Sequence, residues 1–232
     1  MNISDISIIL IAGMVIICIP ISVQMKWYGV TAWKSLVISL TMIITGLYSC
    51  RFWFFLENGY WMGRSFFGAI FFAPITMLIV SKLMKMEYNY ALDFCAPAGC
   101  LIFAILKIEC MIDGCCQGIT LYINENREYV LFPSAAVEFV TALLLAVIIC
   151  VVSKNVEYRG KIYPITMVSY GVLRFILNLL RDDWDRTRRM NLPLPLGNIW
   201  SLVAIAIGGI WIIVLHRKRK YVKYIETERN TL

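Results

Sequence analysis

Long apolar stretches are the feature of this sequence that most restricts its fold. A helix needs about 20 largely apolar residues to cross the hydrocarbon core of a bilayer. Seven stretches come close to that length: 6–23, 29–49, 66–84, 91–112, 134–153, 162–180 and 196–215. They leave little chain for a soluble domain, and 60% of the residues are apolar whereas only 16% are charged. We therefore predict an all-α polytopic membrane protein with about seven transmembrane helices.

The loops between these stretches predict the orientation of the protein. Basic residues follow the third, fifth and seventh stretches, which puts them on one side, and cytoplasmic loops carry an excess of Lys and Arg. We therefore expect a cytoplasmic carboxyl terminus and an amino terminus outside. No Lys or Arg precedes the first stretch and no cleavage pattern follows it, so we expect it to be retained. The chain then divides into a seven-span domain, 1–216, and a basic cytoplasmic tail, 217–232.

The net charge of +7 does not indicate nucleic acid as a partner. A basic tail beside a last span is more typical of a topology signal and of contact with anionic lipids, and no recognition motif accompanies it. Neither a cofactor nor a metal is expected, because the cysteines lack C-x-x-C spacing and the only histidine, His216, lies at the opposite membrane face from Cys110, Cys115 and Cys116. These three thiols either pack at a helix end or oxidise.

The stretch 162–180 contains an arginine where an apolar environment should exclude one. At 100° per residue, Tyr170, Arg174, Asn178 and Arg181 fall within roughly 80° of one helical face. A charge at such depth costs about 3 kcal/mol, so we expect Arg174 to face a protein interior, a wet cavity or an anionic ligand. The alternative is a side chain that extends to water and binds no ligand.

Two further charged residues need partners inside the membrane. Lys107 shares a helical face with Cys110, whereas Glu109 points about 160° away and cannot pair with Lys107 on the same helix. A carboxylate on another span, a cluster of carbonyls, or a lipid phosphate held jointly with Arg174 would satisfy Lys107. Glu138 lies one turn into a helix that starts after Pro133. We prefer it as the countercharge of Arg174 or Lys107.

A series of short motifs follows the order of the predicted spans. It consists of Trp27-Tyr28-Gly29, Gly63-x-Ser65-Phe66-x-Gly68, Asp93-x-x-Ala96-Pro97, Asp113-Gly114-x-x-x-Gly118, Pro133-Ser134-x-x-x-Glu138, Tyr170-Gly171-x-x-Arg174 with Arg181, and Gly197-x-x-x-Ser201. Each motif is weak alone. In this order and placement they resemble the bacterial prolipoprotein diacylglyceryl transferases.

The resemblance implies a multi-pass enzyme of the bacterial plasma membrane. Such an enzyme transfers the diacylglyceryl group of phosphatidylglycerol, or a related anionic phospholipid, to the lipobox cysteine thiol of a prolipoprotein and releases glycerol 1-phosphate. Arginine and lysine suit the phosphate of that lipid, because both form charge-assisted hydrogen bonds with it. The implied catalytic residues are Arg174 and Tyr28. The implied substrate-binding residues are Lys107, Arg181, Asn178, Ser65, Glu138 and Tyr170.

Several positions differ from the family pattern. Phe67 stands where the family has histidine, Lys107 replaces an arginine, Cys110 an asparagine and Cys115 a glutamate, so the motif becomes a Gly-Cys-Cys variant. These differences leave two alternatives to a transferase. One is a catalytically degenerate relative that binds lipid or lipoprotein, and the other is a membrane thiol-redox protein that uses Cys110, Cys115 and Cys116.

Overall fold

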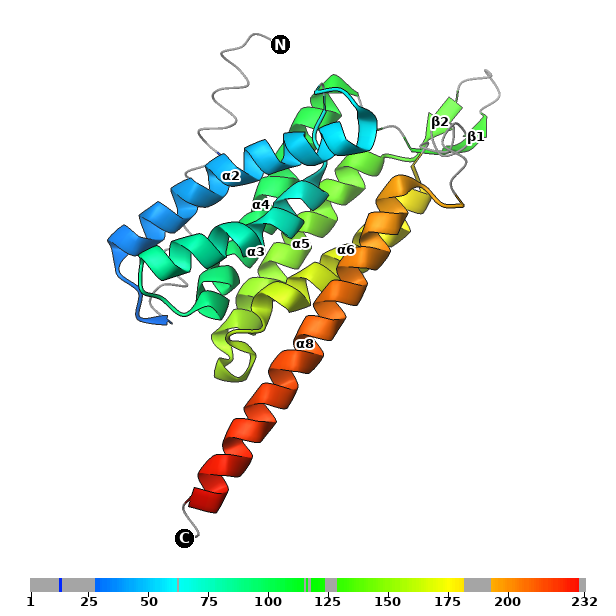
Figure 1. The fold of residues 1–232 in the computed structure, drawn as a ribbon. Coiled ribbons are helices and arrows are strands. Elements are labelled where there is room, and N and C mark those ends of the chain that lie inside the picture. Colours follow the sequence, from blue (N-terminus) through cyan, green and yellow to red (C-terminus); the bar gives the residue numbers. More distant parts are fainter. Residues whose placement is uncertain are drawn as a thin grey trace.

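The structure, a computed structural model, describes residues 13, 28–61, 63–114, 116, 118–123, 129–181 and 193–229. Its elements, drawn in Figure 1, are helices with one short hairpin. In chain order they are α2 (Ala32–Asn58), α3 (Phe66–Leu83), α4 (Tyr88–Asp113), β1 (Thr120–Ile123), β2 (Tyr129–Leu131), α5 (Ser134–Lys154), the 3₁₀ turn η1 (Val156–Tyr158), α6 (Ile162–Leu179) and α8 (Leu196–Arg229).

Six helices in the described part of the chain are long and apolar enough to cross a membrane. They correspond to six of the predicted spans, and the remaining span, 6–23, lies outside the described residues except for Gly13. The prediction of an all-α polytopic membrane protein is therefore confirmed. The number of seven spans and the sidedness of the termini stay predictions.

Two helices extend more than two turns beyond the predicted spans. Helix α2 continues to Asn58, where Gly59 ends it with a left-handed conformation at φ 77°. Helix α8 is membrane-length as far as Lys218 and continues to Arg229. The predicted boundary between 1–216 and 217–232 therefore falls inside one helix, and the division into a membrane domain and a tail stays a prediction.

Small residues bring α6 and α8 close together. A Cβ atom on Gly171 of α6 would lie 2.8 Å from Ile205, and one on Gly208 of α8 would lie 2.8 Å from Val168 and 3.0 Å from the carbonyl oxygen of Pro164. Such contacts let helix backbones approach in a membrane, where there is no hydrophobic force between helices. The two helices run side by side in Figure 1, and this pairing places the start of α8 against the end of α6.

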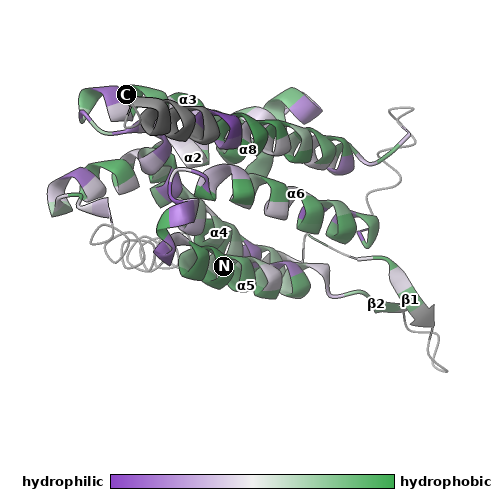
Figure 2. Ribbon diagram, turned by 90° about the horizontal axis from the view of Figure 1, so that it is seen from below, coloured by the Kyte–Doolittle hydropathy of each residue, from purple (hydrophilic) through white to green (hydrophobic). Residues whose placement is uncertain are grey.

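The outward faces of the helices remain apolar, as a lipid-facing surface requires. On α5 the buried positions recur at helical spacing, and several of the side chains between them are more than half exposed, among them Val140, Leu144, Val147 and Val151. Figure 2 shows hydrophobic residues along most of the length of the helices. The buried residues of α5 are Ser134, Ala135, Glu138, Ala142, Leu145, Ala146, Ile149 and Ser153.

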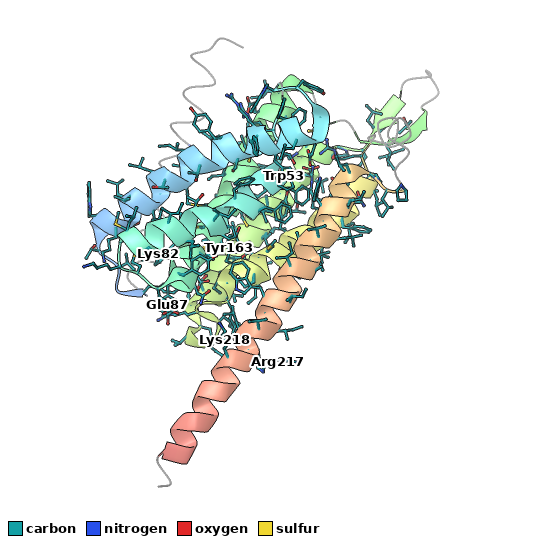
Figure 3. The ribbon with its side chains drawn as sticks, in the orientation of Figure 1. Trp53, Lys82, Glu87, Tyr163, Arg217 and Lys218 are labelled. Atoms are coloured by element: carbon teal, nitrogen blue, oxygen red, sulfur yellow. The ribbon has the colours of Figure 1, made fainter. Side chains whose placement is uncertain are left out.

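The two ends of the bundle differ in character. The hairpin of β1 and β2 joins the end of α4 to the start of α5, and we call this the hairpin end. In Figure 3, Lys82, Arg217 and Lys218 lie toward the other end, from which α8 projects, whereas Trp53 lies toward the hairpin end. These three basic residues therefore lie toward the same end of the bundle, as the predicted topology expects, and the sidedness itself stays a prediction.

The end opposite the hairpin is held by Asp93. Its carboxylate is 1% exposed and accepts hydrogen bonds from the backbone N–H groups of Gly160, Ile162 and Tyr163, the last two at 3.0 and 3.3 Å. An acidic side chain at a helix N-terminus satisfies donors that have no partner inside the helix. Asp93 of α4 therefore fixes where α6 begins.

Candidate functional site

A buried carboxylate on α5 is the centre of the site. Pro133 caps the helix and Ser134 begins it, which confirms the predicted proline-started helix, and Glu138 follows one turn later. The side chain of Glu138 is completely buried, and the hydroxyl of Ser134 donates a hydrogen bond to Oε1 at 3.3 Å. A carboxylate in such a position is retained only if cations or further donors compensate its charge.

Of the cations that the structure describes, three converge on Glu138. Lys107 of α4 lies 2.5 Å from Oε2, Arg174 of α6 contacts the same oxygen, and Arg181 after α6 lies 3.6 Å from Oε1. The prediction that Glu138 is the countercharge of Arg174 or Lys107 is confirmed for both. We call these four residues the ion cluster. It holds three positive charges against one carboxylate, so its excess is positive and suits an anion.

Backbone pairing at the hairpin end holds Arg181 in the ion cluster. Gly118 and Arg181 form an isolated antiparallel bridge, and the N–H of Ile119 donates to the carbonyl of Leu180 at 3.0 Å. A Cβ atom at Gly118 would lie 2.3 Å from the carbonyl oxygen of Phe132, so only glycine fits. The segment between α4 and β1 is thereby tied to the end of α6.

Aromatic rings line the inner side of the cluster. The ring of Phe103 lies 5.2 Å from the Lys107 ammonium and 5.8 Å from the Arg174 guanidinium, distances at which a ring face attracts a cation. Tyr170 meets Phe103 edge-on at 5.3 Å, and Phe67 packs on Tyr170 at 5.8 Å. A small pocket lined by Phe103, Tyr170 and Arg174 continues from the cluster toward the middle of the bundle.

Asn178 lies one helical turn beyond Arg174 on α6. Its side chain is 2% exposed, and its Nδ2 atom has no hydrogen-bond partner among the described residues. A Cβ atom on Gly197 would lie 2.6 Å from that Nδ2 atom, so the start of α8 rests directly on Asn178. A buried amide donor without a partner costs about 1–3 kcal/mol and is available to a ligand.

Two predicted site residues make their contacts outside the ion cluster. The hydroxyl of Ser65 donates to Glu57 at 3.3 Å. Tyr28 donates to Asp93 at 2.9 Å, and its ring lies beneath the guanidinium of Arg159 at 5.1 Å. Asp93 binds the start of α6, and 12 residues of helix, about 18 Å, separate that start from Arg174. Tyr28 therefore belongs to the Asp93 end of the bundle.

Sequence reasoning missed two other features near the site. Arg64 forms an ion pair with Glu109 at 2.6 Å between the start of α3 and the last turns of α4. The helical wheel already excluded Lys107 as the partner of Glu109, so a search for another cation was the available signal. The second feature is a contact between Cys116 and Lys107, whose sulfur and nitrogen atoms lie 3.8 Å apart.

Cys116 follows the end of α4 and lies among cations. A hydrogen bond from Cys110, together with the positive charges of Lys107 and Arg181, lowers the pKa of the Cys116 thiol from 9.0 to about 5 despite partial burial. At neutral pH this thiol is therefore a thiolate. No three His, Cys, Asp or Glu residues lie close enough to hold a metal ion, as far as the described residues extend.

Comparison with known proteins identifies the family. A family model described as prolipoprotein diacylglyceryl transferase matches residues 6–215. Proteins named phosphatidylglycerol–prolipoprotein diacylglyceryl transferase are similar to the chain. One from Dehalococcoides mccartyi strain 195 is 26% identical over 180 residues, which cover 73% of this chain and 66% of that protein. Another, from Clostridium tetani, is 26% identical over 171 residues, covering 68% of this chain and 67% of that protein.

A third relative with the same name, from Mannheimia succiniciproducens, is 25% identical over 174 residues, or 69% of this chain and 63% of that protein. The chain thus aligns with about two thirds of the length of these relatives. The match of the family model spans all six membrane-length helices that the structure describes, apart from the charged end of α8. The chain therefore belongs to the prolipoprotein diacylglyceryl transferase family.

Proposed function

We propose that this protein transfers the diacylglyceryl group of phosphatidylglycerol, or of a related anionic phospholipid, to the lipobox cysteine thiol of a prolipoprotein in the bacterial plasma membrane. The observation that carries the proposal is the ion cluster, where Lys107, Arg174 and Arg181 surround the single carboxylate of Glu138. A lipid phosphate brought sideways from the bilayer would meet an excess of positive charge there.

In this reaction the thiolate of the acceptor cysteine attacks the glyceryl carbon that bears the phosphate. A C–S bond forms, the C–O bond breaks, and glycerol 1-phosphate leaves with the electron pair. Arg174 and Lys107 bind the phosphate and neutralise the charge that develops on it, which makes it a better leaving group. The attacking sulfur belongs to the substrate, so the chemistry requires no nucleophile from the enzyme.

The remaining predicted residues take supporting parts in this proposal. Arg181 adds a third positive charge, Glu138 holds the cations in place while the site is empty, and Tyr170 with the amide of Asn178 orients the headgroup. Ser65 and Tyr28 contact Glu57 and Asp93 instead, so we assign them to holding the helix ends rather than to contact with the phosphate.

A second candidate is a relative that binds lipid or lipoprotein without transferring the group. The observation that favours it is Phe67, which is 3% exposed and packs on Tyr170 at a position where a histidine is usual in the family. A phenyl ring neither accepts nor donates a proton, so general-base help at that position is lost.

The test uses the purified chain in nanodiscs that contain phosphatidylglycerol, a synthetic lipobox peptide and mass spectrometry. We expect a diacylglyceryl adduct on the peptide cysteine. Nanodiscs of phosphatidylcholine alone and a peptide with serine in place of the cysteine are the controls, and neither should yield an adduct. Retention of peptide or lipid without any adduct would contradict transfer and support the binding relative.

A further inference from the structure

The proposed transfer reaction leaves two thiols of the site without a part in the chemistry. Cys110 and Cys116 both lie beside Lys107 at the hairpin end of the bundle. We propose that these two cysteines are a reactive thiol pair that exchanges with external disulfides and closes into an intramolecular disulfide beside Lys107.

The end of α4 brings the two thiols together. Lys107 and Cys110 are three residues apart and share a face of the helix. Gly114 then ends α4 in the left-handed conformation at φ 62°, which turns the chain back over that face. Cys116 consequently lies 3.8 Å from the Lys107 ammonium and accepts a hydrogen bond from the Cys110 thiol. Two sulfur atoms joined by a hydrogen bond need only a small shift to form a covalent bond.

The charges around Cys116 make it the attacking member of the pair. Lys107 and Cys110 face it from α4, Arg181 from the end of α6, and Glu138 from α5. The two cations outweigh the carboxylate, and the pKa of about 5 keeps Cys116 a thiolate at neutral pH. Reactive cysteines occupy such electropositive, partly exposed positions, whereas buried structural cysteines stay protonated. Cys95 and Cys100, by contrast, are buried among the apolar residues of the bundle.

The exchange balances without any other reactant. The Cys116 thiolate attacks one sulfur of an external disulfide, the S–S bond breaks, and the leaving thiolate takes up a proton. Cys110 then loses its proton, attacks the Cys116 sulfur of the mixed disulfide and releases the second external thiol. Two protein thiols are oxidised to one disulfide while one external disulfide is reduced to two thiols. By the predicted topology the pair faces outside, where disulfides persist.

The pairing is tested on the purified full chain in micelles, with oxidised and reduced glutathione in varied ratio. All variants carry Cys115→Ser, so that only two thiols remain in the segment. After acid quenching and alkylation, peptide mapping should find a Cys110–Cys116 link that grows with the oxidised fraction. Cys110→Ser should stop at a glutathione adduct on Cys116, and Cys116→Ser should leave Cys110 unmodified.

The matched control is Cys150→Ser, which removes a half-buried thiol of α5 and should leave the link unchanged. Alkylation with a limiting amount of reagent, in the protein that carries Cys115→Ser alone, should modify Cys116 before any other described thiol. This readout leaves both cysteines of the pair in place. Absence of the link at every ratio would overturn the proposal. So would equal glutathione uptake by Cys110 and Cys116 in the two single variants. Neither measurement requires transfer activity, so failure here is distinct from failure of the proposed function.

Discussion

Replacing Glu138 by glutamine should destabilise the protein much more than the same replacement of Glu109, a partly exposed carboxylate. The substitution keeps the shape of the side chain but leaves Lys107 at 2.5 Å, together with Arg174 and Arg181, without their shared carboxylate. Breaking a buried ion pair from one side costs about 3–5 kcal/mol. Because a domain of about this size loses roughly 2–4 °C in Tm per kcal/mol, we expect a fall of about 10 °C.

The matched control is Glu109→Gln, which removes the carboxylate of the Arg64 pair. The side chains of that pair are 28% and 23% exposed, so its loss should cost at most about 1 kcal/mol. The assay is thermal unfolding in detergent with and without inorganic phosphate. Phosphate should restore part of the stability of Glu138→Gln, because it replaces the lost negative charge, and should have no such effect on Glu109→Gln. Equal losses in the two variants, or no rescue of the first, would refute the account of the ion cluster.

Three other outcomes follow from the structure. Gly208→Ala should cost about 1–3 kcal/mol in thermal unfolding, because its Cβ meets α6 within 3.0 Å, whereas Gly209→Ala, which meets nothing within 4 Å, should unfold like the parent protein. The rate at which iodoacetamide alkylates Cys116 should stay constant as the pH falls from 9 and should drop to half only near pH 5. Lys107→Gln should raise the pH of this midpoint. A midpoint near pH 8.5 in the parent protein would contradict a thiolate at Cys116. A cysteine engineered into 220–232 should resist an impermeant thiol reagent applied to intact cells, and labelling from outside would reverse the predicted topology.

The sequence predicted Glu138 as the countercharge of Arg174 or Lys107 because charge burial in a membrane is expensive. Arg174, Lys107 and Glu138 each lie within an apolar stretch, so each needed a partner, and few partners were available. The face that Arg174 and Asn178 share on α6 also follows from helical periodicity alone, whereas Arg181 lies beyond the end of α6. These arguments needed no knowledge of how the helices pack.

The features that the sequence did not predict depend on contacts between distant segments. Asp93 binds backbone N–H groups some 70 positions later in the chain. No pattern of side chains in the sequence indicates which backbone groups a carboxylate will bind. Tyr28 donates to the same carboxylate, at the opposite end of the bundle from the ion cluster. Helix α2 continues past its predicted span, where Trp53 packs on Trp200 at 4.8 Å, and it ends only at the left-handed Gly59.

The measurement that tests the central claim most directly is diacylglyceryl transfer by variants of Arg174 in phosphatidylglycerol nanodiscs. Arg174→Ala removes a buried charged contact worth about 3 kcal/mol, so the rate of transfer to the lipobox peptide should fall about a hundredfold or more. Arg174→Lys should recover only part of the rate, because an ammonium lacks the planar fork that binds two phosphate oxygens. Arg51→Ala, at an exposed arginine of α2, should transfer at the parent rate. Full activity in Arg174→Ala would contradict the account.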